Sequence, residues 1–373
     1  MSQEILNNVR KNLFAIKPYS PGKPISDVKR EFGLTDVTKL ASNENPLGPS
    51  PKAQAAILAA VANVNRYPDG GAVSLKEALS ANTGIPTEQI LVGNGSDDLI
   101  KLTSETFLHP GDEIVVPSPS FSQYWFGAQL MDAKTVAVPL TAGFEYDLEA
   151  MLNAVTEKTK ILYLCSPNNP TGTYLREADL QRFLDRVPSR VLVILDEAYN
   201  EYVTEGDTAQ GIDFLKRGYN VLVMRTFSKM YALAGLRLGY VLGRSEVLDA
   251  INRTREPFNV NMLAQVAAVA ALDDAEHVEA SRQLNRAGFA QLQAGLGQLG
   301  YDVVPTQGNF LIFDTRLDDN KLFDALLREG VITRSGTALG IPGYLRVSIG
   351  LPEENERFLA AFEKVVSSLA QKV

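Results

Sequence analysis

Short apolar runs alternate with amphipathic segments from about residue 25 to about residue 260, and this alternation is what most constrains the fold. The runs are rich in β-branched residues and predict strands. They lie at 90–92, 113–116, 135–138, 160–165, 191–195, 221–225 and 238–242, with helices predicted between them that include 50–62, 97–108, 147–157 and 176–187. Strands that are apolar on both faces and separated by helices are typical of a mostly parallel sheet covered by helices on both sides. The sequence therefore predicts an α/β fold.

The pattern changes after residue 260 and predicts a smaller α+β unit. Its expected elements are long helices over 260–299, a strand at 309–313, a helix at 319–329, a two-stranded stretch at 331–349 and a helix at 353–371. A chain of 373 residues is long enough for two domains. We expect a large domain at 47–259, and a second domain made of 1–46 and 260–373. No flexible linker separates them, which predicts a cleft between the two.

The N-terminal arm contains two segments with different sequence patterns. Residues 4–16 have the apolar spacing of a helix. Two prolines and a glycine make 17–24 irregular. The start of the chain lacks the apolar core of a signal peptide.

Composition excludes several classes of protein. The net charge of -8 argues against a nucleic-acid-binding protein. Cys165 is the one cysteine, so neither an intramolecular disulfide nor a cysteine metal cluster is possible. His109 and His277 are the two histidines; we interpret both as structural and expect no metal site. No apolar run approaches the ~20 residues of a membrane span, and a reducing cytoplasm is the expected compartment.

Glycines and polar residues follow the first predicted strand of this set, at the edge where open parallel sheets bind ligands. The chain reads GNGSDD over 93–98 and then enters a helix. Free N–H groups at a helix N-terminus bind phosphate, although the same residues suit a plain strand-to-helix turn. The glycine spacing matches neither a dinucleotide fingerprint nor a nucleotide P-loop.

Three later strands are also followed by residues that could bind a ligand or take part in a reaction. SPNNPTG at 166–172 holds two asparagine amides between prolines, or simply forms a turn. Asp196 ends a buried strand, where a carboxylate is costly unless it meets a cation or hydrogen-bond donors; it could also cap the next segment. Lys229 follows Thr226 and Ser228 and is either a surface lysine or, where its pKa falls, an amine nucleophile.

These features are more informative together than singly. They comprise a phosphate turn, a rigid asparagine loop, a buried acid followed by Tyr199, and Lys229 with Arg237 eight residues further on. No metal or nucleotide motif accompanies them. The set suits a cofactor with one phosphate, a ring nitrogen that pairs with a carboxylate, and an aldehyde that reacts with a lysine. That cofactor is pyridoxal 5'-phosphate.

Several ordered segments also resemble a known family. SPNNPTG, DEAY, TFSKMYALAGLRLGY and LRVSIG look like those of fold-type-I, class I/II aminotransferases. LASNENPLGPSP, NRYPDG and the YSPGKP arm narrow the resemblance to the histidinol-phosphate aminotransferase family. It extends from about residue 19 to about residue 365. It implies the fold-type-I architecture, with a large domain around a mostly parallel sheet and a smaller α+β domain.

The resemblance implies roles around the cofactor. Lys229 would bind the cofactor aldehyde and later carry a proton, and Asp196 would keep the pyridine nitrogen protonated. Tyr199 and Asn169 would hydrogen-bond the phenolic oxygen of the ring, and Phe121 would stack on the ring. The phosphate would lie in a cradle that comprises Gly95, Ser96, Asp97, Thr226, Ser228 and Arg237.

Further roles concern the substrate and the assembly. Tyr67 resembles a tyrosine that reaches the phosphate from the other subunit, which implies a homodimer with shared sites. Arg346 matches the arginine that binds a substrate carboxylate, and Arg334 lies near the position for a substrate phosphate. Asn43 lies at the same end of the site, and Tyr19 belongs to a closing arm.

The implied reaction converts L-histidinol phosphate and 2-oxoglutarate to imidazole acetol phosphate and L-glutamate, a step of histidine biosynthesis. An aromatic amino acid aminotransferase would share every cofactor residue, and a threonine-phosphate decarboxylase shares the fold. A pyridoxal-phosphate-sensing regulator without turnover is a third alternative, but no basic DNA-binding segment precedes residue 40. One departure is visible at 144–148, which reads FEYDL where related sequences often have a histidine.

Overall fold

The larger sheet is mostly parallel, as predicted. The computed structural model describes residues 3–18 and 22–370, and within them seven strands form this sheet. Only β8 runs against its neighbours, because it pairs antiparallel with both β2 and β7. In spatial order the strands are β2 (Ile90–Gly93), β8 (Gly239–Leu242), β7 (Val221–Thr226), β6 (Leu192–Asp196), β5 (Thr159–Cys165), β3 (Glu113–Ser118) and β4 (Lys134–Pro139).

Helices cover both faces of this sheet. Because successive strand residues point to opposite faces, each strand contributes side chains to both cores. Val193 and Val223 belong to the core on one face, while Ile194 and Met224 belong to the core on the other. The first core includes α2 (Pro51–Ala60), α3 (Val73–Thr83), α6 (Leu148–Asn153), α7 (Glu177–Leu184), α8 (Gly211–Lys216) and α10 (Met262–Leu272). The second includes α4 (Ser96–Phe107), α5 (Gln123–Leu130) and α9 (Ser245–Asn252). This burial on both sides explains the continuous apolar runs.

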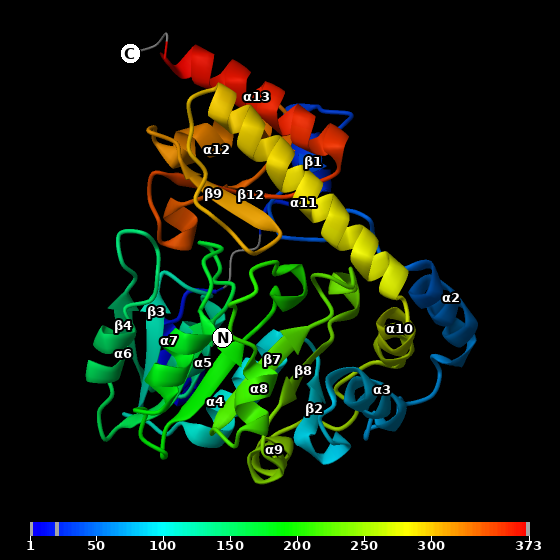
Figure 1. Ribbon diagram of the computed structural model, residues 1–373, viewed down its shortest axis with the longest axis vertical. Helices are drawn as coiled ribbons and strands as arrows, with labels where there is room; N and C mark the ends of the chain where they lie inside the picture. The colour runs from blue at the N-terminus through cyan, green and yellow to red at the C-terminus, as the bar shows by residue number, and fades with distance from the viewer. Residues whose placement is uncertain (1–2, 19–21, 371–373) are drawn as a thin grey trace.

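A smaller α+β unit lies above the sheet in Figure 1. Its antiparallel sheet has the order β11 (Arg334–Ser335), β12 (Tyr344–Ser348) and β9 (Phe310–Asp314). Around it pack α11 (Ala275–Gln298), α12 (Asp319–Arg328) and α13 (Pro352–Ala370). The long α11 extends from beside α10 up to α13, so it connects the two units (Figure 1).

The N-terminal arm differs from the prediction at its start. Residues 4–16 do not form one helix, but lie mainly in two short 3-10 helices, Gln3–Asn8 and Lys11–Ala15. The apolar side chains of Ile5 and Phe14 are exposed, so no buried face stabilises an α-helix there. After α1 (Ile25–Phe32), β1 (Thr38–Lys39) pairs in parallel with β10 (Val331–Ile332), which attaches the arm to the smaller unit.

The division into two domains stays a proposal, and one helix bears on where it falls. The expected boundary follows residue 259, yet α10 packs against α2 and α3. Its Ala264, Ala267 and Ala268 are buried in the core of the larger unit. These contacts favour a division after α10, close to the start of α11.

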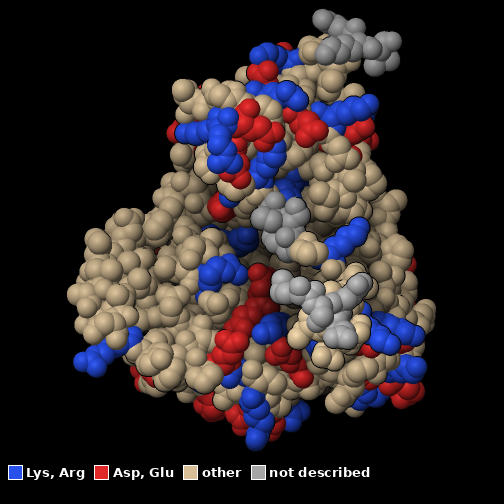
Figure 2. Space-filling view, turned by 180° about the vertical axis from the view of Figure 1, so that it is seen from behind, with Lys and Arg blue, Asp and Glu red and all other residues tan. Residues whose placement is uncertain are grey.

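The surface in Figure 2 has acidic and basic side chains close together rather than one continuous basic area. Across residues 3–18 and 22–370, no helix is long and apolar enough to cross a membrane. The same residues contain no group of three or more His, Cys, Asp or Glu side chains that could hold a metal ion.

Candidate active site

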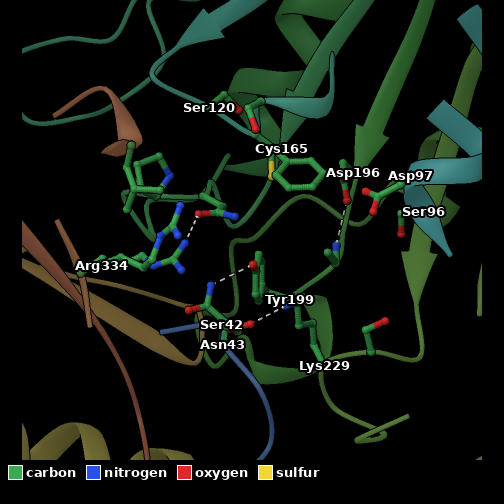
Figure 3. Close-up of a pocket in the computed structure, with 18 of the residues that line it drawn as sticks. Ser42, Asn43, Ser96, Asp97, Ser120, Cys165, Asp196, Tyr199, Lys229 and Arg334 are labelled. Atoms are coloured by element: carbon green, nitrogen blue, oxygen red, sulfur yellow. Dashed lines mark hydrogen bonds between the residues drawn. The ribbon is translucent and has the colours of Figure 1, made fainter. Parts of the chain in front are cut away.

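The polar segments that follow the strands meet at one edge of the larger sheet. Asp196 and Thr226 are the last residues of the adjacent parallel strands β6 and β7. Because β8 is reversed, β2 points the same way as β7, and Gly239 lies opposite both Gly93 and Thr226. A cavity of about 600 Å³ lies here, with residues of β11 and β12 on its other side (Figure 3).

Lys229 lies in the turn after β7 and reaches into this cavity. Its Nζ donates a hydrogen bond of 2.9 Å to the backbone oxygen of Ser42 (Figure 3). Desolvation lowers the pKa of Lys229 to about 8, and the positive charge of Arg346 contributes to the decrease. An amine with such a pKa is neutral far more often near neutral pH than an ordinary lysine, and so is more available as a nucleophile or base.

Two adjacent acids at the end of β6 have different surroundings. Glu197 forms a buried ion pair with Arg225, at 2.8 Å between Oε2 and Nη2. Asp196 is equally buried but has no ion-pair partner among the described residues; it accepts hydrogen bonds from the hydroxyl of Tyr124 (2.7 Å) and from the amide of Ala198 (3.2 Å). Burial raises the pKa of Asp196 to about 6. A cation in the cavity would stabilise this carboxylate.

Tyr199 and Asn169 lie between the larger sheet and the smaller unit. The hydroxyl of Tyr199 accepts a hydrogen bond of 3.0 Å from Asn43 Nδ2 (Figure 3). Asn169 Oδ1 accepts one of 2.6 Å from Arg346 Nη1, and Arg346 Nη2 donates to the backbone oxygen of Ala41. Arm, loop and β12 therefore hold these side chains jointly.

The N-terminus of α4 has the features of an anion site. No side chain caps this helix, and the hydroxyl oxygen of Ser96 is buried without a hydrogen-bond partner among the described residues. Gly95 has a φ of 89°, and a Cβ built there would lie 2.6 Å from Arg237 Nη2. A Cβ at Gly239 would lie 2.8 Å from the amide nitrogen of Ser96. The two glycines thus allow Arg237 and the helix N-terminus to approach one anion.

A second cationic area lies across the cavity. Arg334 and Arg346 are directly paired residues of β11 and β12, and both line the cavity. Two guanidinium groups on neighbouring strands repel each other unless an anion lies between them. Their arrangement therefore favours a phosphate or carboxylate at this end.

Comparisons with known proteins identify the family. The family described as Aminotransferase class I and II matches residues 35–362. The chain belongs to the class I and II aminotransferases. A histidinol-phosphate aminotransferase of Moorella thermoacetica is 48% identical to it over 96% of this chain and 93% of that protein. One from Symbiobacterium thermophilum is 50% identical over 96% of this chain and 98% of that protein.

A solved structure shows the same fold. The crystal structure of histidinol-phosphate aminotransferase from Sinorhizobium meliloti, in complex with pyridoxal-5'-phosphate, matches with a TM-score of 0.89. The identity is 26%, and the match covers 97% of this chain and 98% of that one. This aminotransferase therefore has the predicted α/β, fold-type-I architecture.

Most residues singled out from the sequence of this aminotransferase line the one cavity, and their roles stay predictions. These are Asn43, Ser96, Asp97, Phe121, Asn169, Asp196, Tyr199, Thr226, Ser228, Lys229, Arg237, Arg334 and Arg346. Tyr67 does not line it: its side chain is 82% exposed and stacks on Phe258, with ring centroids 4.7 Å apart. Tyr19 lies outside the described residues.

The two histidines and the 144–148 segment lie outside the cavity lining. His277 lies in the first turn of α11 and forms a hydrogen bond with the backbone oxygen of Gly48, and His109 follows α4 at the surface. In 144–148, Asp147 caps α6 and Tyr146 donates a hydrogen bond to the backbone oxygen of Cys165. The contacts of this segment are thus structural.

The sequence analysis missed three residues that contact the site of this aminotransferase. Tyr124 lies on α5, three residues after Phe121, and donates to Asp196; α5 has no amphipathic pattern, so its sequence carries no signal that Tyr124 points to the sheet edge. Ser348 lies within the LRVSIG segment, but only its arginine was singled out. Ser42 contributes a backbone oxygen, for which a sequence carries no signal.

Proposed function

We propose that this aminotransferase uses pyridoxal 5'-phosphate to transfer the amino group of L-histidinol phosphate to 2-oxoglutarate. The products are imidazole acetol phosphate and L-glutamate, in histidine biosynthesis. The observation that carries the proposal is that Lys229 shares one cavity with the paired arginines Arg334 and Arg346. Relatives at 48% and 50% identity, named histidinol-phosphate aminotransferases, support it.

The described residues fit the cofactor group by group. Asp196 is buried without an ion-pair partner, so a protonated pyridine nitrogen would supply the missing cation. The buried Ser96 hydroxyl would donate to a phosphate oxygen, beside the α4 N-terminus and Arg237. Thr226 and Ser228 line the same end of the cavity. Lys229 offers an amine with a lowered pKa.

When bound, the cofactor supplies an aldehyde that captures an amine, and a ring that delocalises the electron pair left after a proton is removed. Lys229 Nζ would accept the proton from the substrate carbon that bears the amine and would return it later. Asp196 would stabilise positive charge at the ring nitrogen. Tyr199 and Asn169 would hydrogen-bond the phenolic oxygen of the ring.

The two substrates differ in the anion that they present. Histidinol phosphate carries a phosphate but no carboxylate, whereas glutamate carries two carboxylates. One pocket must therefore accept either anion, and a guanidinium group can do so because its planar fork pairs with both. Arg334 and Arg346 give the cavity this property at the end away from the Ser96 cradle.

We also propose that two copies of this chain form a homodimer. Leu58, Val61 and Val64 are exposed in α2 and in the residues that follow it. Tyr67 comes three residues after Val64, and its exposed ring stacks on Phe258. In Figure 2 a broad face nearly free of charged side chains lies on the side where Figure 1 places α2, α3 and α10. Exposed large apolar side chains on a face with so few charges mark a protein interface. A two-fold partner would bring its Tyr67 toward the cofactor phosphate.

The test is a comparison of amine donors on the purified holoenzyme. Initial rates are measured with histidinol phosphate, phenylalanine and threonine phosphate, each with 2-oxoglutarate. We expect the highest kcat/KM for histidinol phosphate. A higher value for phenylalanine would assign the protein to aromatic amino acids, and release of carbon dioxide from threonine phosphate would assign it to the decarboxylases. Cofactor binding without turnover of any donor would favour a regulator.

A further inference from the structure

Asn43 connects the smaller unit to the hydroxyl of Tyr199 by a closed set of hydrogen bonds. Its amide nitrogen Nδ2 lies 3.0 Å from Tyr199 Oη, and its Oδ1 lies 2.9 Å from the hydroxyl oxygen of Ser348 on β12. Its backbone N–H donates to the same Ser348 oxygen at 2.8 Å. Asn309 donates to its backbone oxygen at 2.9 Å. Asn43, Ser348 and Asn309 are all buried.

The directions of these hydrogen bonds follow from the backbone N–H of Asn43, which can donate but cannot accept. The backbone N–H of Asn43 must donate, so Ser348 Oγ accepts there and has its own proton left to give. That proton has one recorded acceptor among the described residues, Oδ1 of Asn43. If the amide were turned around, the buried Ser348 proton would lose that acceptor, at a cost in free energy. The amide is therefore fixed with Nδ2 toward Tyr199.

Tyr199 has one hydroxyl proton, and this arrangement decides where it goes. Because Nδ2 of Asn43 can only donate, Tyr199 Oη accepts from it and keeps its own proton for another partner. Tyr199 lines the cavity, and Figure 3 shows Asn43 on one side of its hydroxyl. The remaining direction for the proton is the cavity.

We propose that Ser348 is a positioning residue that keeps the hydroxyl proton of Tyr199 directed into the cavity, where it is donated to the bound cofactor. This inference rests on the proposed function, because it needs the cofactor ring beside Tyr199. Without the Ser348 hydroxyl, the Asn43 amide can turn. Tyr199 then donates to Asn43 Oδ1 and offers the cavity only lone pairs.

The consequence is a spectroscopic shift that does not depend on turnover. A hydroxyl that donates to the ring oxygen of the cofactor withdraws charge from it and eases loss of the neighbouring proton. The absorbance of the bound cofactor changes with pH at a midpoint that reports this proton. Removal of the donor by Tyr199→Phe should raise the midpoint by about one pH unit, the effect of one ordinary hydrogen bond.

The test is a pH titration of cofactor absorbance in wild type, Ser348→Ala, Tyr199→Phe and the double variant. We expect Ser348→Ala to raise the midpoint toward that of Tyr199→Phe, and to add nothing in the Tyr199→Phe background. Ser348→Thr keeps the hydroxyl and should restore the wild-type midpoint. The matched control is Ser335→Ala, which removes a buried hydroxyl on β11 that donates to Asn320 and accepts from the backbone N–H of Ala338; it should leave the midpoint unchanged.

A second variant protects the test if Ser348→Ala does not fold. Asn43→Asp tolerates the left-handed φ of 54° at this position and presents only acceptors to Tyr199. It too should raise the midpoint, and by more in the wild-type background than in the Tyr199→Phe background, where only the added negative charge acts. A wild-type midpoint in Ser348→Ala, or an equal shift with Phe at 199, overturns the inference alone. A wild-type protein that binds no cofactor overturns the proposed function instead.

Discussion

Asp196 shows how a single residue can favour function at the expense of stability. Its carboxylate is buried at the end of β6, and Tyr124 and Ala198 donate to it, but among the described residues no cation pairs with it. Desolvation outweighs these two hydrogen bonds and raises its pKa from 3.8 to about 6. The cofactor-free protein therefore carries a buried charge at neutral pH, which a bound cation would neutralise.

The first prediction concerns Asp196→Asn in the cofactor-free protein. Between pH 3.8 and about 6 the folded wild type binds more protons at this site than the unfolded chain, so this group lowers stability as pH rises through that window. Above about pH 6 the ionised carboxylate of Asp196 lowers the free energy of unfolding by its full amount. Asparagine has no charge to bury, so we expect the variant to be more stable by ~2 kcal/mol at about pH 8, with a smaller difference at about pH 4.5. Urea unfolding of the variant and the wild type at the two pH values measures both stability differences.

The same variant separates stability from catalysis. With cofactor bound, a carboxamide cannot hold a protonated ring nitrogen, so turnover should fall far below that of wild type. An Asp196→Asn protein that is less stable than wild type at about pH 8, or that turns over at a near-normal rate, contradicts the role assigned to this carboxylate.

At the scale of elements, what could be predicted follows from burial. The strands of the larger sheet are apolar on both faces, so their runs are visible in the sequence, and the residues that follow β5, β6 and β7 were expected at one edge. The 3-10 segments before residue 16 were predicted as a helix, because spacing alone does not reveal that Ile5 and Phe14 stay exposed.

Register, and pairing between distant segments, could not be predicted. The two-stranded stretch at 331–349 was expected, but not the register that places Arg334 opposite Arg346. The pairing of β1 with β10, and the contact between Tyr124 and Asp196 across 72 residues, likewise depend on tertiary packing. These contacts decide which side chains share the cavity, so the site needed the fold.

The second prediction uses this register. Arg334→Ala should lower kcat/KM for histidinol phosphate by the equivalent of ~1.5–3 kcal/mol, the usual contribution of a hydrogen bond to a charged group. Phenylalanine has no phosphate and should be affected less. Lysine at 334 should recover only part of the loss, because it offers a point charge without the planar fork. Steady-state kinetics with both donors measure the difference.

The control for Arg334→Ala is Arg328→Ala. Arg328 ends α12 in the same unit, is exposed and lies over the ring of Phe32, away from the cavity lining. It should leave both donors unaffected. Equal losses for histidinol phosphate and phenylalanine in Arg334→Ala would mean that this arginine organises the site and does not recognise the phosphate.

At the scale of the whole molecule, the homodimer stays a proposal that rests on the position of Tyr67. Tyr67 lies 82% exposed on the stacked pair with Phe258, next to the exposed Val64 and outside the cavity lining. In the proposed dimer the apolar face around α2 is buried, and each Tyr67 serves the site of the other subunit. The sequence could suggest this only through the NRYPDG resemblance.

The third prediction tests this exchange with hybrid dimers. Lys229→Ala and Tyr67→Phe subunits are each expected to give impaired homodimers. In a mixed dimer, one site carries both changes and the other carries neither, so mixing should restore part of the activity. Mixed dimers that form, as shown by differently tagged subunits, but restore no activity would mean that Tyr67 serves its own subunit.

The central claim is that Lys229 binds the cofactor at the end of β7. The direct measurement is borohydride reduction of the purified holoenzyme, followed by digestion and mass analysis of the modified peptide. We expect a yellow protein whose cofactor becomes fixed to Lys229, and a Lys229→Ala variant that still binds cofactor through the Ser96 and Arg237 cradle but is not labelled. A label on any other lysine, or none on the wild type, would contradict the account.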